Sequence, residues 1–148
     1  MILYLDTSSL VKLYLEEPHS DLVRGWMDEA EAVATSRVAY PEALGAFARR
    51  RESGDLSGEG LDRLRQAFAS DWSSLILLPV RERRAGSLAV KHLLRGFDAI
   101  HLSAAADLID LLRSEEVLFS SFDARLLRAA REEGVPALHP AGEVAPPE

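Results

Sequence analysis

Short, unbroken apolar runs recur along the chain, separated by longer segments whose apolar residues follow helical spacing. Runs of this kind are typical of strands that are buried on both faces of a parallel sheet. Strand candidates cover residues 2–5, 32–35, 75–78, 117–119 and 137–139. Because these strands alternate with helical segments, the pattern predicts an α/β domain with a mostly parallel sheet.

The segments between these runs predict helices that begin at capping hydroxyls or a proline and end at a glycine or proline. Predicted helices follow Thr7–Ser9 as far as Pro18 and then cover residues 20–30, 40–51, 60–69, 81–94, 98–113 and 124–133. Residues 141–148 include two prolines and predict a loose, flexible tail. A single domain over residues 1–140 is therefore expected.

Composition narrows the classes of function. The chain has 148 residues, with 17 basic and 24 acidic side chains and a net charge of −7, which excludes a domain with general affinity for phosphate backbones. The absence of cysteine excludes disulfides, thiolate metal sites and a cysteine nucleophile. No apolar run approaches the ~20 residues of a membrane span, and the start lacks the basic segment of a signal peptide. We therefore expect a cytoplasmic protein with no membrane segment.

Two acids follow predicted strands. Asp6 comes directly after the first strand, and Asp123 comes shortly after the fourth. In a parallel sheet the carboxyl ends of the strands share one edge, and ligands bind in the crevice there. The two side chains are therefore expected to face each other. The alternative is that each acid only caps the helix that follows it, although Ser8 and Ser9 stand closer to the first helix and offer caps instead of Asp6.

Asp98 lies on the apolar side of its predicted helix, opposite a polar arc formed by Ser103, Asp107 and Asp110. A carboxylate on a buried face is costly unless it is paired, hydrogen-bonded or bound to a metal. Its place in the first turn also suits a simple cap, because the helix dipole favours an anion there. Asp107 and Asp110 are interpreted as solvated surface.

Glu42 is ambiguous on its own, because an acid early in a helix is favoured by the dipole. It shares a helical face with Ala46 and Arg49. If all four acids meet in one crevice, their negative charges repel one another. The repulsion between two such charges 4 Å apart is ~4 kcal/mol at an effective dielectric near 20. Either some acids become protonated or a divalent cation lies among them.

The donor types favour Mg²⁺ or Mn²⁺, which prefer oxygen ligands. A site of this kind supports metal-assisted hydrolysis of phosphodiesters. Zinc is disfavoured because none of the four histidines forms an HxxxH or HxH pair.

The acids occur in four blocks, which are YLDTSSLVKLY, SRVAYPEALGAFARR, LRGFDAIHLSAAADL and LFSSFDARLLRAAREEG. In this order the set resembles the PIN-domain ribonucleases, and its nearest group is the VapC toxins of bacterial and archaeal toxin–antitoxin pairs. The resemblance implies a three-layer α/β/α fold around a five-stranded parallel sheet in order 3-2-1-4-5. It also implies that the first and fourth strands flank the switch point where Asp6 and Asp123 lie.

The resemblance further implies the site. Its catalytic, metal-binding acids correspond to Asp6, Glu42, Asp98 and Asp123, and its supporting hydroxyls to Thr7, Ser8 and Ser121. It implies cleavage of RNA with Mg²⁺ or Mn²⁺ to 5′-phosphate and 3′-hydroxyl ends, a homodimer, and silencing by a cognate VapB-type antitoxin. The last block has Ser-Phe-Asp where many relatives have Thr-x-Asp, a change that preserves the hydroxyl.

Other side chains are open to two interpretations. The chain has 15 arginines and 2 lysines, and most of the arginines are expected to pair with nearby acids. Arg49 is the preferred RNA contact because it shares the face of Glu42. His101, one turn after Asp98, is interpreted as a satisfied structural residue, with a proton shuttle as the alternative. The aromatic residues are interpreted as core or interface.

Two other classes of protein compete with a nuclease. In the first, the acids are only helix caps and the domain is a non-catalytic, PIN-like module that binds another protein. In the second, the domain is a receiver-type phosphoacceptor, which needs a lysine near the fifth strand. The only lysines are Lys12 and Lys91, which counts against this second class.

Overall fold

Five parallel strands form the centre of the molecule, as the computed structural model shows for residues 1–138 and 144–145, which are the ones it describes. Their order is β3-β2-β1-β4-β5, which confirms the order expected from the resemblance. The strands are β1 (Ile2–Leu5), β2 (Ala32–Ser36), β3 (Ile76–Leu78), β4 (Val117–Ser120) and β5 (Ala137–Leu138). The first and fourth strands are direct neighbours, with Leu5 opposite Ser120.

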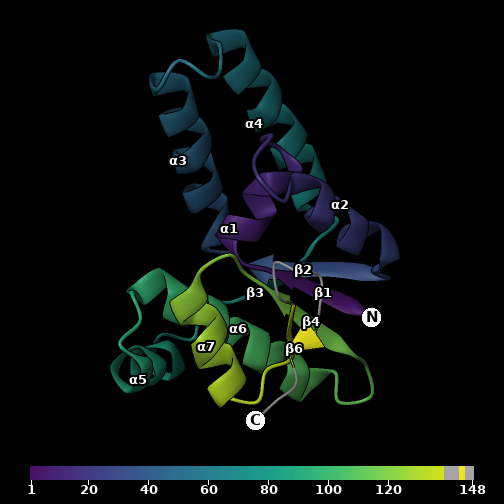
Figure 1. Ribbon diagram of the computed structural model, residues 1–148, viewed down its shortest axis with the longest axis vertical. Coiled ribbons are helices and arrows are strands. Elements are labelled where there is room, and N and C mark those ends of the chain that lie inside the picture. The colour runs from purple at the N-terminus through teal and green to yellow at the C-terminus, as the bar shows by residue number, and fades with distance from the viewer. Residues whose placement is uncertain (139–143, 146–148) are drawn as a thin grey trace.

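Helices cover both faces of the sheet (Figure 1), so the predicted three-layer architecture is confirmed. One layer contains α1 (Thr7–Leu10), the short 3-10 helix η1 (Val11–Leu13), α2 (Ser20–Glu29), α3 (Ala39–Glu52) and α4 (Gly58–Trp72). The other contains α5 (Glu82–His92), α6 (Gly96–Leu111) and α7 (Ala124–Glu132). No helix within the described residues is both long enough and apolar enough to cross a membrane.

Alternating side chains of each strand enter two separate cores. Leu3 and Leu5 belong to the core beneath α1–α4, whereas Tyr4 and Phe119 belong to the core beneath α5–α7. All four are fully buried. Because both faces of β1 and β4 are covered, these strands are unbroken apolar runs rather than alternating ones.

The prediction that Asp107 is solvated surface is wrong, whereas the same prediction for Asp110 is confirmed. Ser103 and Asp107 are buried, with 1% and 7% of their surface exposed, while Asp110 is exposed. The reason is the packing of α5 against α6, which brings Arg81 and Arg84 to the Asp107 carboxylate. A buried carboxylate is tolerated when cations and hydrogen bonds satisfy it, and no sequence periodicity on α6 alone reveals partners on α5.

Two residues of the predicted tail belong to a strand. Residues Val144–Ala145 form β6, which pairs antiparallel with β5. The outer edge of β5 would otherwise leave backbone N–H and C=O groups without partners. The remaining residues of that predicted tail lie outside the described residues, as does the predicted strand residue 139.

Candidate active site

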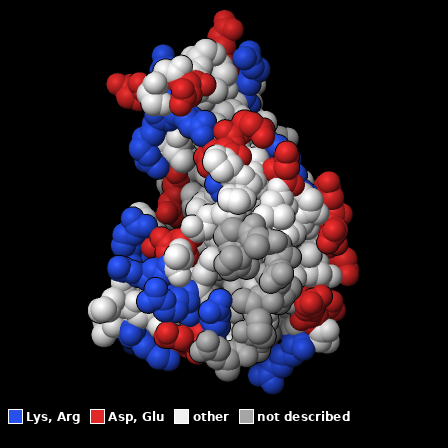
Figure 2. All heavy atoms as spheres, in the orientation of Figure 1, with Lys and Arg blue, Asp and Glu red and all other residues white. Residues whose placement is uncertain are grey.

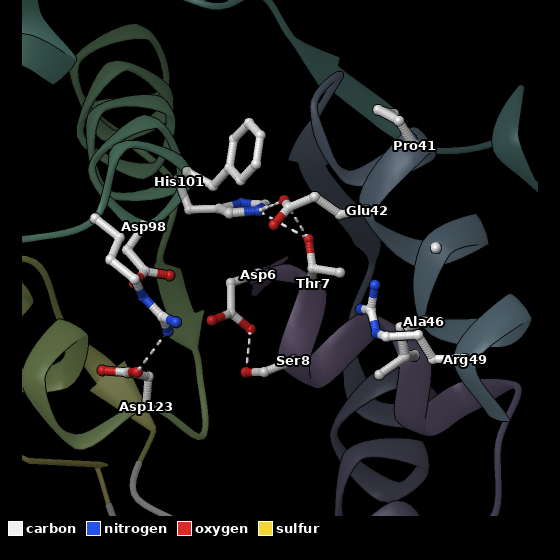
Figure 3. Close-up of a pocket in the computed structure, with 14 residues that line it drawn as sticks. Asp6, Thr7, Ser8, Pro41, Glu42, Ala46, Arg49, Asp98, His101 and Asp123 are labelled. Carbon is white, nitrogen blue, oxygen red and sulfur yellow. Dashed lines mark hydrogen bonds and ion pairs between the residues drawn. The ribbon is translucent and has the colours of Figure 1, made fainter. Parts of the chain in front are cut away.

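A cavity of about 530 Å³ lies at the carboxyl edge of the sheet. The loops after β1 and β4 meet α3 and the start of α6 there (Figure 3). All four predicted acids line it, from four separate segments of the chain: Asp6, Glu42, Asp98 and Asp123. The prediction that distant carboxylates face one cleft therefore agrees with the structure.

Asp6 and Asp123 are both helix caps. Asp6 caps α1, and its Oδ1 accepts hydrogen bonds from the Ser9 amide at 2.9 Å and from Ser8 Oγ at 2.7 Å. Asp123 caps α7, and its Oδ1 accepts from the Leu126 amide at 2.9 Å. The suggestion that a serine caps the first helix in place of Asp6 is wrong. In each acid the cap uses Oδ1, which leaves Oδ2 for the cleft.

Hydroxyl groups join the two acid-bearing loops. Ser8 Oγ donates to Asp6 and accepts from the Phe122 amide at 3.0 Å. Ser121 Oγ accepts from the Asp123 amide at 3.1 Å. The predicted supporting residues Ser8 and Ser121 thus hold the backbone that carries each carboxylate, and Ser8 links one loop to the other.

Glu42 is held by a network that runs into the core. Its Oε1 accepts from Thr7 Oγ1 at 2.7 Å and lies 3.0 Å from His101 Nε2. On the other side of the ring, His101 Nδ1 lies 2.9 Å from the Tyr4 hydroxyl. One assignment satisfies every partner: Tyr4 donates to Nδ1, and Nε2–H donates to Glu42. Burial keeps the pKa of Tyr4 well above its usual range, so this hydroxyl retains its proton.

This network sets the charge of Glu42. Burial by itself would raise the pKa of Glu42, but hydrogen bonds from His101 and Thr7, together with the charge of Arg49, leave it below its ordinary value. His101 is only 2% exposed and both ring nitrogens have partners, as the structural interpretation expects. It also borders the cleft, so its role includes the positioning of Glu42.

Asp98 stands in the first turn of α6 and is partly buried. Burial raises the pKa of Asp98 above its ordinary value, the charge of Asp123 adds to the increase, and Arg95 opposes it. Arg95 Nε lies 3.3 Å from Asp98 Oδ2, and its Nη2 lies 3.6 Å from Asp123 Oδ2. Arg95 was not predicted from the sequence as a site residue. The available signal was its position immediately before the helix that carries Asp98.

The residue types fit a hard divalent cation. Four carboxylates supply oxygen donors only, which suits Mg²⁺ or Mn²⁺ better than zinc. Burial raises the pKa of Asp98, and the nearby charge of Asp123 adds to that increase. Within the described residues, no three His, Asp or Glu side chains are already gathered closely enough to hold a metal. Arg95 and His101 engage three of the four acids in this conformation.

Two further side chains line the cleft without belonging to the acid network. Arg49 has no carboxylate within 4.0 Å among the described residues. Its Nη1 packs against Gly45, and a Cβ atom added at Gly45 would lie 3.2 Å from that nitrogen. Phe97 is 56% exposed. It therefore does not belong to the core, because it lines the cavity at the start of α6, and the alternative interpretation as interface stays a prediction.

Comparison with known proteins identifies relatives of this chain. A family model described as "PIN domain" matches residues 3–132. Ribonuclease VapC45 and ribonuclease VapC46, both from Mycobacterium tuberculosis, are 36% identical over 107 residues and 34% identical over 142 residues. The first match covers 70% of this chain and 74% of the relative, and the second covers 93% and 97%.

Solved structures share the fold. FitAcB from Neisseria gonorrhoeae superposes with a TM-score of 0.64 at 18% identity, covering 97% of this chain and 100% of that one. PAE2754 from Pyrobaculum aerophilum superposes with a TM-score of 0.61 at 18% identity, covering 87% and 79%. With the family model and the curated relatives, these matches show that the chain belongs to the PIN-domain family, in its group of VapC ribonucleases.

Proposed function

We propose that this protein is a divalent-metal-dependent endoribonuclease and the toxin of a VapBC-type toxin–antitoxin pair. The observation that carries the proposal is the convergence of four carboxylates, from four segments of the chain, on one cavity. The names of the curated relatives support RNA as the substrate. The products are 5′-phosphate and 3′-hydroxyl ends, and the cofactor is Mg²⁺ or Mn²⁺.

Asp6, Glu42, Asp98 and Asp123 would hold the cation. When bound there, it would activate water for attack on phosphorus and stabilise the leaving oxygen. The protein contributes preorganised ligands, because the caps fix Oδ1 of Asp6 and Asp123 and leave Oδ2 directed to the cleft. Such prior ordering lowers the entropy cost of assembling the site.

Glu42 is the acid best placed to orient the attacking water. His101 and Thr7 both bond Oε1, which leaves Oε2 without a hydrogen bond to the described residues. The lowered pKa of Glu42 keeps the carboxylate ionised near neutral pH. Its Oε2 can therefore accept a hydrogen bond from water and hold that water in place.

The distribution of charge permits an acidic protein to bind RNA. Without the four site acids, the net charge rises from −7 to −3. Figure 2 shows acidic atoms at the indentation on the left of the view, between basic groups that lie over α3 above and over α5–α7 below. Arg49 can contact a phosphate, and Phe97 can stack on a base.

The most direct assay incubates the purified protein with several RNAs, with Mn²⁺ or with EDTA. Asp98→Asn should abolish cleavage, as should EDTA. Asp110→Asn is the matched control, because Asp110 lies on the same helix but is exposed and outside the cavity. Cleavage that survives both EDTA and Asp98→Asn would reject the proposal.

The competing function is a non-catalytic PIN-like module that binds another protein. The caps formed by Asp6 and Asp123 are the observation in its favour. A cap alone does not explain why Glu42 and Asp98 line the same cavity. Silencing by a VapB-type antitoxin remains part of the proposal, supported by the names of the VapC relatives. A homodimer and a cytoplasmic location stay predictions.

A further inference from the structure

Arg95 joins two of the site acids that come from different parts of the chain. It is the N-cap residue of α6. Its guanidinium lies 3.3 Å from Asp98 on that helix and 3.6 Å from Asp123 in the loop after β4. In both contacts the acceptor is Oδ2. For Asp123 this is the oxygen that the α7 cap leaves free.

The three side chains differ in how firmly they are held. Asp98 and Asp123 are partly buried, with 21% and 31% of their side-chain surface exposed, whereas Arg95 is 81% exposed. Asp123 is also fixed by its cap. Exposed ion pairs are individually weak, so the guanidinium can leave the two acids at low cost while the acids stay in place.

We propose that Arg95 is a tethered counter-cation that competes with the divalent metal for Asp98 and Asp123. The inference rests on the proposed function of the acids as metal ligands. It assigns to Arg95 a role in setting the affinity of those acids for the metal. The guanidinium contacts Oδ2 of both acids, and its positive charge repels a divalent cation that binds to the same carboxylates. Metal binding therefore requires the Arg95 side chain to swing out into solvent.

The competition lowers the apparent affinity for metal. Only molecules in which Arg95 has left the acids are competent to bind, so the dissociation constant rises in inverse proportion to that fraction. In the absence of metal, Arg95 offsets the repulsion between Asp98 and Asp123. The same residue thus supports the metal-free fold and opposes loading of the site.

Arg125 provides a matched control. It lines a small cavity together with Arg95, Asp98 and Asp123. However, its Nη1 donates to the Leu93 carbonyl at 3.2 Å, and no carboxylate lies within 4.0 Å of it among the described residues. Arg95→Met and Arg125→Met each remove one positive charge beside the site, and only the first removes the bridge between the acids.

The test is calorimetric titration of Mn²⁺ into the whole protein at fixed ionic strength, with thermal unfolding of each variant in parallel. Arg95→Met should bind Mn²⁺ about three- to tenfold more tightly than wild type. Its melting temperature should be lower without metal, and the rise on adding Mn²⁺ should be larger. Arg125→Met should stay within about twofold of wild type. Arg95→Lys keeps the positive charge but loses the planar guanidinium whose two nitrogens reach both carboxylates. The Mn²⁺ affinity of this variant should therefore lie between those of wild type and Arg95→Met.

The outcomes separate the two proposals. If wild type binds Mn²⁺, Asp98→Asn abolishes binding, and Arg95→Met binds no more tightly than wild type, the counter-cation role is wrong while the metal site stands. Equal tightening by Arg95→Met and Arg125→Met would also reject it, because the effect would then be one of general charge. If wild type shows no Mn²⁺ binding that depends on Asp98, the proposed function itself fails.

Discussion

Asp6 and Asp123 are separated by 117 positions in the sequence (123 − 6), yet each caps a helix through Oδ1 while lining the same cavity. Capping and metal binding are therefore not exclusive roles for these acids. A carboxylate has two oxygens, and the backbone amides that occupy one of them hold the other in a fixed direction. The cap is the means by which the fold orients the ligand.

This dual role predicts a separation of stability from metal binding. Asn caps helices about as well as Asp, so Asp6→Asn should change the unfolding free energy of the metal-free protein by no more than about 0.5 kcal/mol. Asp6→Ala should cost about 1 kcal/mol. Both variants should lose the increase in melting temperature that Mn²⁺ produces in wild type. Asp28→Asn, an exposed change on α2, should retain it. A full Mn²⁺ response in Asp6→Asn would leave the cap as the only role of Asp6.

Glu42 and Asp98 should affect the metal-free fold in opposite directions. The folded-state pKa of Asp98 lies above its ordinary value of 3.8. The ionised carboxylate therefore destabilises the folded protein at pH values above that folded-state pKa. Asp98→Asn should then raise the melting temperature at pH 7 by an amount on the order of 2 °C. The gain should disappear as the pH falls below 3.8, where the wild-type carboxyl is protonated in both states.

For Glu42 the sign reverses. Its pKa lies below 4.5 in the folded state, so its charge adds stability above pH 4.5 and loses that effect as the pH falls through the folded value. Glu42→Gln should therefore lower the melting temperature at pH 7 by an amount on the order of 2 °C, with no difference in strong acid. Calorimetric scans from pH 3 to pH 8 without metal test both variants. Shifts of the same sign would show that the two environments are misassigned.

Arg49 should act on RNA binding through charge. Because it has no carboxylate partner in the described part of the chain and lines the cleft, Arg49→Ala should weaken binding. It should also reduce the slope of log affinity against log salt by about 0.7, the value for one phosphate contact on a single strand. Arg51→Ala removes a charge from the same helix outside the cleft and serves as the control. An unchanged slope in Arg49→Ala would remove Arg49 from the contacts.

Phe97 should act on RNA binding through stacking. Phe97→Ala should weaken binding by about 1–3 kcal/mol with little dependence on salt, because stacking on one base has that magnitude. Its effect on stability should be small, since the side chain is 56% exposed. Leu111→Ala removes an exposed apolar side chain at the other end of α6 and should leave binding unchanged. Equal loss in the two variants would argue against a specific stacking role.

The sequence predicts those features that depend on local pattern and on one topological rule. Short apolar runs indicate the strands, and the shared carboxyl edge of a parallel sheet brings Asp6 to Asp123. The sequence does not reveal features that depend on a partner residue from elsewhere in the chain. Asp107 looks solvated on its own helix but is buried against arginines of α5. Likewise, the sequence does not distinguish Arg95 from other surface cations. Its role depends on the loop after β4, which brings Asp123 close to it.

The central claim is that the carboxylates of this cleft together bind a divalent cation, and a crystal structure grown with Mn²⁺ tests it most directly. We expect an anomalous difference peak among the carboxylate oxygens of Asp6, Glu42, Asp98 and Asp123. The Arg95 guanidinium should have moved away from both of its present partners. Fully ordered carboxylates with no such peak at saturating Mn²⁺, and with Arg95 still bridging Asp98 and Asp123, would contradict the claim.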